Sequence, residues 1–407
     1  MTTNQQKEPI QSKIDFLNEA FIRNPHPIYA EVREKEPVSR FLLPSGHYAW
    51  IVTTYEDVAA VLNDSRFVTS HPVEEGVEQR KLPSHVEIIS RNLSNVNASD
   101  HRRLRRLVQK AFTPRMVEEL RGRIVELTND LLDQVQAKGE MNLIQDFAFP
   151  LPIKVICEML GVPVEDQDKF SDWSGAIMEG FNNPMLAERS EQALIAFIDY
   201  LQQLIAKRRS DLKQDLISDL IRVEEDGDML SEHELYAMIF VLIIAGHETT
   251  VNLIGNGVLS LLEHPEQLEM LKNEPGLIQS AIEEILRYDG PVEVNNVRWA
   301  TEDVELQGKQ IREGEMVFVA LSSANRDGSH FTDPTTFDIT RKVNDHLAFG
   351  KGIHFCMGAP LARLEGEIAI STLLRRMPAL RLQTNRESLD WRHGIIIRGL
   401  KEIPLVF

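Results

Sequence analysis

Apolar residues recur at helical spacing through the middle of the chain. The clearest pattern follows Thr113-Pro114, a pair that suits the N-cap and first position of a helix. Its apolar members are Met116, Leu120, Ile124, Leu127, Leu131 and Val135. Gly139 can end this helix, so we predict one helix across residues 114–139 and further helices as far as about Tyr288.

A second pattern predicts a much longer helix. Ser231 and Glu234 are spaced as a capping box, and the helix that they open can run to Glu263, just before His264-Pro265. Such a helix has about 32 residues and is about 48 Å long. Its first half is apolar on nearly every face, so we expect it to lie through the middle of the protein.

Strand patterns are short and few. Residues 48–54 predict a strand, whereas residues 69–99 lack a sustained period and predict a long loop with at most a short helix. Later strand patterns occupy residues 316–321, 380–383 and 403–407. Pro404 makes the last of these an edge strand at best. We therefore predict a mainly α fold with a small β region, in a single domain over residues 1–407.

The acidic charge balance narrows the choice of partners. A formal net charge of -18 opposes binding to nucleic acid or anionic lipid. Only Cys157 and Cys356 are present, which predicts a reducing compartment, the cytoplasm, rather than a disulfide framework. Residues 1–15 are polar and lack a signal-peptide pattern, and the uncharged runs 235–246 and 249–262 are too short to span a bilayer. We expect no membrane anchor.

The context of Cys356 is rich in glycine. The residue lies in FGKGIHFCMG (residues 349–358), ahead of a helical pattern. Glycine allows a tight loop and close approach of a flat ligand, and a helix N-terminus favours a thiolate, the form that binds iron. The alternative is a small buried hydrophobe, which would not need this glycine spacing. Cys157, in an apolar helical run, fits that alternative.

This segment is similar to the haem-binding signature of the cytochromes P450, down to the basic residue two before the cysteine. The resemblance covers essentially the whole chain and is greatest to soluble bacterial members. It implies the triangular, mostly helical haem-thiolate fold and a haem b whose iron is ligated by Cys356. The implied reaction inserts one oxygen atom from O₂ into an unactivated C–H bond.

The motif AGHETT (residues 245–250) falls in the middle of the long predicted helix. Polar side chains inside an apolar helix are costly unless they are partnered or used. The resemblance implies that Glu248 and Thr249 relay protons during oxygen activation. The alternative is a helix kink with satisfied polar groups, and we expect His247 to be structural.

Two further groups of residues match positions of the family. Glu284 and Arg287 are helix neighbours, which alone is typical of a solvated surface pair. The resemblance implies instead that they form a network with Arg341 and hold the loop that leads to the cysteine.

The second group is basic. The resemblance implies that these side chains bind the haem propionates, for which charge-assisted hydrogen bonds are suited. The residues are His101, Arg105, Arg298 and His354. For His101 and Arg105, four apart on a predicted helix, the alternative is a solvated basic face.

The sequence contains no flavin or ferredoxin module, so we expect NAD(P)H to supply electrons through separate proteins. We expect an acidic ferredoxin or flavodoxin, with its reductase, to dock on a basic segment, residues 101–110, and the protein to be a monomer. The side chains expected to face this partner are Arg102, Arg103, Arg106 and Lys110. A hydrogen-peroxide-driven peroxygenase and a non-enzymatic haem sensor are the rival functions.

The expected substrate pocket draws on residues 72–96, 181–186, 241–245, 292–296 and 395–396, which are largely apolar with a few amides. The chain resembles the bacterial branch that hydroxylates polyketides, macrolides and other bulky secondary metabolites. We therefore expect a bulky hydrophobic substrate with oxygen functions, such as a polyketide or a steroid- or statin-like ring system. Medium-chain fatty acids are the alternative. Asn295 or Asn296 is expected to hydrogen-bond a polar group of the substrate.

Overall fold

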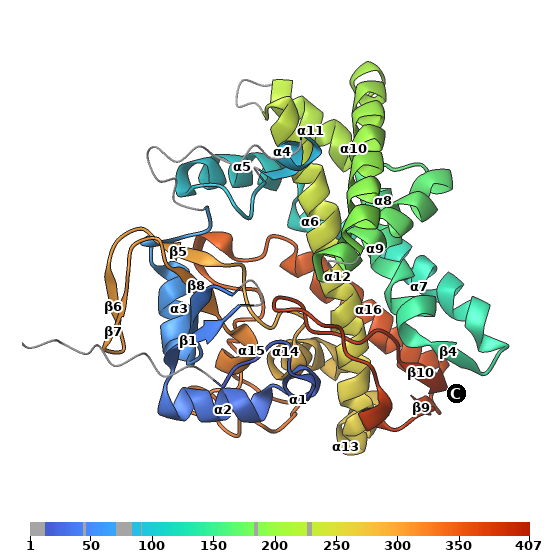
Figure 1. Cartoon of the computed structure of the whole chain (residues 1–407). Coiled ribbons are helices and arrows are strands. Elements are labelled where there is room, and N and C mark those ends of the chain that lie inside the picture. Colours follow the sequence, from blue (N-terminus) through green and yellow to red (C-terminus); the bar gives the residue numbers. More distant parts are fainter. Residues whose placement is uncertain (1–12, 44–45, 71–83, 91, 183–185, 226–229) are drawn as a thin grey trace, which may run out of the picture.

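A single long helix, α12 (Glu232–Glu263), runs through the middle of the protein (Figure 1). The computed structural model describes residues 13–43, 46–70, 84–90, 92–182, 186–225 and 230–407. Ser231 and Glu234 form the predicted capping box, and the helix ends where the sequence indicates. Among the described helices, α12 alone is long and apolar enough to span a bilayer. However, 67% of its most apolar stretch is buried inside the protein, as in a core helix.

Among the described helices, four make the most extensive contacts with α12. They are α4 (Ser84–Ser90), α8 (Pro150–Leu160), α14 (Ile278–Asp289) and α16 (Ala359–Arg376). Helix α4 falls in the segment where the sequence predicts a loop with a short helix. These contacts place residues from distant parts of the chain around α12.

Apart from α6 and α7, which are described below, nine further α-helices surround this central group in the described part of the chain (Figure 1). They are α1 (Glu19–Arg23), α2 (His26–Lys35), α3 (Tyr55–Asn63), α5 (Ala98–Ala111), α9 (Gln167–Asn182), α10 (Ala187–Ser210), α11 (Leu216–Glu225), α13 (Pro265–Asn273) and α15 (Leu321–Ala324). The mainly α character predicted from the sequence is confirmed.

The helix predicted over residues 114–139 is divided in two. Thr113 caps the first part, α6 (Pro114–Glu119), as expected, and α7 (Arg121–Gln136) follows. At Leu120 the backbone N–H donates to the carbonyl of Val117, only three residues back, at 3.1 Å. This tighter turn interrupts the α-helical hydrogen-bond ladder, which an apolar period alone does not reveal.

The larger sheet joins residues 38–68 to residues 298–319. Its strands, in spatial order, are β1 (Val38–Leu42), β2 (Tyr48–Val52), β8 (Met316–Val319), β5 (Arg298–Ala300) and β3 (Phe67–Val68). Strands β2 and β8 pair in parallel, with Ile51 opposite Phe318. A separate hairpin consists of β6 (Val304–Leu306) and β7 (Lys309–Ile311).

The prediction that the last strand lies at the edge of a sheet is wrong. Strand β10 (Pro404–Val406) lies between β4 (Glu140–Asn142) and β9 (Arg381–Leu382) in a three-stranded sheet. Pro404 is the first residue of the strand, where a missing N–H breaks no interior bond. Its carbonyl still accepts the Gln383 N–H at 2.9 Å. The proline therefore does not prevent a central position.

Candidate active site

The glycine-rich loop around Cys356 folds back on itself just ahead of α16. Gly350 and Gly352 have φ values of +70° and +73°, a region that favours glycine. A Cβ at Gly352 would lie 2.9 Å from the carbonyl oxygen of Leu62. The Cys356 N–H donates to the Phe349 carbonyl at 2.9 Å and closes the loop. The glycine spacing thus has a steric cause.

The surroundings of the Cys356 thiol act on its pKa in opposite directions. Burial raises the pKa, whereas the backbone N–H groups of Gly358 and Ala359 and the charge of Arg105 lower it without reversing the shift. The helix N-terminus therefore favours the thiolate, as predicted, but does not produce it alone. A bound metal ion deprotonates a coordinating thiol outright. Burial also raises the pKa of Cys157, to about 12, consistent with a structural residue.

Basic side chains from three elements gather beside the cysteine loop. The rings of His101, on α5, and His354 lie 4.1 Å apart between centroids. Arg105, one helical turn after His101, donates to the Ile353 carbonyl at 3.1 Å. Arg298 on β5 acts on both histidines, since its charge contributes to the lowered pKa of each. The structure therefore brings together all four residues expected to bind propionates.

The positive charge of this basic cluster is not balanced by nearby carboxylates of the described residues. Burial and the neighbouring cations lower the pKa of His101 to about 4 and of His354 to about 3, and burial lowers that of Arg298 to about 10. Among the described residues, no carboxylate contributes to these shifts. His101 Nδ1 and Arg298 Nε are buried without a hydrogen-bond partner in the same part of the structure. A ligand with two carboxylates and a thiolate-bound metal, as haem is, fits this donor set.

The acid and alcohol of the AGHETT motif lie at the middle of α12. Thr249 Oγ1 donates to the Ala245 carbonyl of its own helix at 2.7 Å, which leaves the oxygen free to accept. Ala245 is exposed, although α12 is otherwise a core helix. Glu248 is only 3% exposed. A buried carboxylate needs a partner.

That partner is Arg392, which the sequence analysis missed. Its guanidinium forms an ion pair with Glu248 from a loop 144 residues further along the chain. No local motif could have indicated a contact over this separation. His247, adjacent to Glu248, is buried, and its Nδ1 lies 3.2 Å from Ser174 Oγ. Burial lowers the pKa of His247 to about 3, so it is a neutral core histidine.

Glu284 and Arg287 are not a surface pair. Both side chains are 0% exposed, and Arg287 Nη2 lies 2.7 Å from Glu284 Oε1. Arg341 Nε joins the same carboxylate at 3.1 Å, so the three residues form the expected network. Arg287 also donates to backbone carbonyls of Asn325, Pro334 and Thr336. The network therefore holds the chain over residues 325–341, ahead of the cysteine loop.

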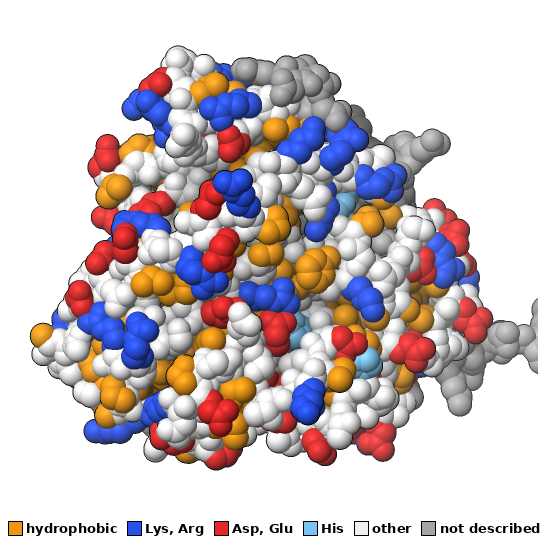
Figure 2. All heavy atoms as spheres, turned by 180° about the vertical axis from the view of Figure 1, so that it is seen from behind, with side chains coloured by type: hydrophobic (Ala, Val, Ile, Leu, Met, Phe, Trp, Pro, Cys, Tyr) orange, Lys and Arg blue, Asp and Glu red, His pale blue; other side chains and the backbone are white. Residues whose placement is uncertain are grey.

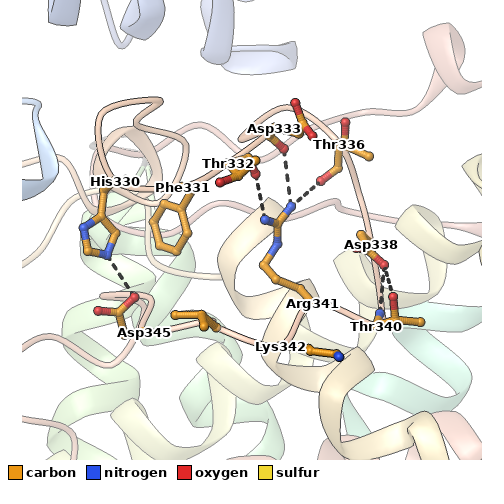
Figure 3. Close-up of a pocket in the computed structure, with 11 residues that line it drawn as sticks. His330, Phe331, Thr332, Asp333, Thr336, Asp338, Thr340, Arg341, Lys342 and Asp345 are labelled. Atoms are coloured by element: carbon orange, nitrogen blue, oxygen red, sulfur yellow. Dashed lines mark hydrogen bonds and ion pairs between the residues drawn. The ribbon is translucent and has the colours of Figure 1, made fainter.

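The segment held by this network carries an open hollow of about 620 Å³ (Figure 3). Figure 3 shows the Arg341 side chain reaching toward Thr332, Asp333 and Thr336, and His330 paired with Asp345. None of the residues expected to bind haem or to relay protons lines this hollow. It is a surface feature of the loop rather than the substrate pocket.

The outer face of α5 is only partly as predicted. Arg102, Arg106 and Lys110 are exposed, whereas Arg103 forms an ion pair with Glu234 at the start of α12. Seen from behind, Lys and Arg side chains gather around the region of α5 (Figure 2). A surface for an acidic partner is thus available without Arg103.

Parts of the expected substrate pocket can be located. Residues 72–83 and 183–185 lie outside the described residues. Several apolar side chains remain partly uncovered inside the fold: Val241, Leu242, Ile244, Val292 and Ile395. The Asn295 side-chain oxygen accepts the Asn296 N–H at 2.7 Å, so Asn295 shapes its own loop. Asn296 is exposed and is the better candidate to contact a substrate.

Comparisons with known proteins agree with this geometry. The Cytochrome P450 family model matches residues 16–391. Cytochrome P450 107B1 of Saccharopolyspora erythraea is 46% identical over 395 residues, 96% of each chain. The polyketide biosynthesis cytochrome P450 PksS of Bacillus subtilis is 42% identical over 391 residues, 95% of this chain and 96% of PksS. The solved structure of PksS has a TM-score of 0.90 and covers 97% of this chain and 99% of its own. P450BioI, solved with a hexadec-9Z-enoic acid ligated acyl carrier protein, has a TM-score of 0.88 at 41% identity, covering 95% and 99% of the two chains.

Proposed function

This chain belongs to the cytochrome P450 family, and we propose that residues 1–407 form one catalytic domain in which Cys356 ligates the haem iron. The protein is a haem-thiolate monooxygenase, which uses O₂ and receives electrons that originate from NAD(P)H through redox partners. When bound, haem with a thiolate ligand supplies the activation of O₂ that C–H oxidation requires. The observation that carries the site assignment is the uncompensated basic cluster beside Cys356.

In this proposal the basic cluster orients the cofactor. Arg105 and Arg298 keep their charge at neutral pH and would pair with the propionates. His101 and His354 would donate hydrogen bonds, and the two negative charges would offset the burial and the repulsion between cations that lower the pKa values of both histidines. The same charges would give His101 Nδ1 and Arg298 Nε the partners that they lack.

The ligand assignment is tested by the spectrum of the reduced protein with CO. The wild type should show the red-shifted Soret band that gives the family its name. Cys356→Ser should abolish it, whereas Cys157→Ser, the matched control in a buried helix, should retain it. A normal band in Cys356→Ser would overturn the assignment.

Glu248 and Thr249 are proposed to manage protons. The Thr249 hydroxyl is anchored by its bond to Ala245, so its oxygen has a fixed position on the exposed side of α12. Glu248, next to it, can accept a proton and release it again. Because a peroxygenase or a sensor has no need of this pair, its presence favours the monooxygenase. Consumption of O₂ and NAD(P)H with redox partners would distinguish the three functions.

The substrate is proposed to be a bulky hydrophobic molecule with oxygen functions, such as a polyketide. PksS, a relative over most of the chain, is named for polyketide biosynthesis. The partly uncovered apolar side chains of α12 would contact the carbon skeleton, and Asn296 would hydrogen-bond a polar group. Fatty acids are the alternative, consistent with the acyl-carrier-protein complex of P450BioI.

A compound screen for the low-spin to high-spin shift tests this proposal. A polar group of the ligand that is buried in the pocket and left unpaired costs about 1–3 kcal/mol, which is up to about two decades in Kd. Asn296→Leu should therefore weaken an oxygenated ligand and spare its deoxygenated analogue. Equal weakening of both would show that Asn296 only shapes the loop.

An acidic ferredoxin or flavodoxin, with its reductase, is proposed to deliver electrons in the cytoplasm. Arg102, Arg106 and Lys110 would attract it on the outer face of α5. Arg105 connects this helix to the cysteine loop through the Ile353 carbonyl, which keeps the docking surface close to the ligand loop. We propose that the protein acts as a monomer.

A further inference from the structure

Arg392, the ion-pair partner of Glu248, also lines a small hollow, together with Glu293 and Arg398. The other residues lining it are Phe16, Phe21, Ile22, Gly394 and Ile397. The space open to the centre of a water molecule is about 10 Å³, enough for about one water and too small for an organic substrate. Arg392 thus has contact both with this hollow and with a carboxylate that is 3% exposed.

The loop that carries Arg392 is fixed from both sides by the first helix. Arg398 Nη1 donates to the Ile22 carbonyl at 2.8 Å, and Arg23 Nη1 donates to the Glu387 carbonyl at 2.6 Å. His393 Nε2 lies 3.4 Å from Glu19 Oε1. These contacts tie the segment to α1, and the Arg392 N–H donates to the Gly399 carbonyl at 2.9 Å, so the backbone that presents the Arg392 guanidinium to Glu248 is itself hydrogen-bonded.

The hollow is also lined by a buried carboxyl group with a raised pKa. Glu293 is 5% exposed, and Tyr29 donates to its Oε1 at 3.0 Å. Burial raises the pKa of Glu293 to about 7, although Arg398 and the Tyr29 bond act in the opposite direction. Asp289, the other acid of this region, is paired with Arg398 at 2.8 Å. Glu293 is therefore the carboxyl group of the hollow that is protonated or ionised according to the pH around 7.

We propose that protons for the reaction come in through this hollow under α1, where Glu293 holds them and Arg392 positions Glu248 to receive them. The inference rests on the proposed role of Glu248. Each proton comes from water, is taken up by the Glu248 carboxylate and is then released, so the carboxylate returns to its ionised form. Arg392 is a positioning residue, because it acts on the protons through its ion pair with Glu248.

The route is tested with the haem-loaded protein, a ferredoxin with its reductase, and dodecanoic acid as the probe. NADPH consumption is measured in H₂O and in D₂O. Reduction of O₂ to product, peroxide or water consumes protons in every case, so the rate reports the route even if the probe is poorly hydroxylated. Arg392→Ala should lower the rate at least several-fold and enlarge the solvent isotope effect. Arg392→Lys, which keeps the charge, should restore part of the rate.

One double variant and one further single variant separate this inference from its premise. Arg392→Ala combined with Glu248→Gln should be no slower than the slower single variant, because both act on one route. Glu293→Gln should slow the reaction and flatten its pH dependence around pH 7. Lys401→Ala, which removes an exposed pair with Asp390, is the control and should change nothing.

Unfolding gives a readout independent of activity. Arg392→Ala should lower the Tm in the wild type and lower it less when Glu248 is already Gln, since the buried charge is then absent. If Arg392→Ala lowers the Tm but leaves the rate and isotope effect unchanged, Arg392 is only structural and the inference is wrong. If Glu248→Gln itself leaves them unchanged, the proposed proton relay fails.

Discussion

The buried Glu284–Arg287 pair permits a quantitative prediction. Arg287→Ala removes two bonds to a carboxylate that is 0% exposed and leaves the Asn325 and Pro334 carbonyls without a donor, while the Thr336 carbonyl keeps one from Arg341 at 3.3 Å. Breaking one side of a buried ion pair costs about 3–5 kcal/mol. Arg341 remains on Glu284 and keeps the cost from rising further. For 407 residues the entropy of unfolding is about 0.85 kcal/mol per degree, so we expect the Tm to fall by about 4–6 °C.

Thermal unfolding of the haem-loaded protein, followed by circular dichroism, measures this loss. Arg121→Ala is the matched control, because Arg121 and Glu118 are 46% and 63% exposed and such pairs contribute less than about 1 kcal/mol. Arg287→Lys should lie between the wild type and Arg287→Ala, since lysine keeps the charge but not the planar fork. If Arg287→Ala melts within a degree of Arg121→Ala, the network does not hold residues 325–341 as argued.

Three further predictions concern protons, electrons and pH. Thr249→Ala should leave haem binding intact and divert NAD(P)H to peroxide or water, whereas Thr249→Ser should not; unchanged coupling in Thr249→Ala would remove the hydroxyl from the relay. Charge reversal at Arg102 and Arg106 should slow electron transfer without affecting substrate binding, and equal wild-type rates at low and high salt would argue against this surface. Burial raises the pKa of Glu365 to about 8, so this carboxyl opposes folding as the pH rises from about 4.5 through 8. Glu365→Gln should therefore raise the Tm at pH 9 relative to the wild type and have little effect at pH 4; equal shifts at both would contradict this.

The sequence predicts the features that depend on local pattern. The ends of α12 follow from a capping box and a proline, and the position of Cys356 ahead of α16 follows from glycine spacing. The break at Leu120 was missed because an apolar period continues across a tighter turn. The central position of β10 was missed because a proline is harmless at the first position of a strand.

Residues that are far apart in the chain but meet in the fold leave no local pattern in the sequence. Arg392 lies 144 residues from Glu248, and no spacing indicates that they meet. The burial of Arg287 was similarly invisible, since a helical acid–arginine pair has the same sequence on a surface and in a core. Only the resemblance to a family predicted its network.

The parallel pairing of β2 with β8 has a consequence for synthesis on the ribosome. Strand β2 begins at Tyr48 but its neighbour begins at Met316, so more than three quarters of the chain must emerge before the larger sheet can close. During that time the Trp50 to Val52 edge has β1 as its only partner strand in that sheet. The helices that precede residue 316 depend on local hydrogen bonds and can form first. The nascent N-terminal hairpin is thus the segment most in need of protection from aggregation, and slow translation before residue 316 would lengthen its exposure.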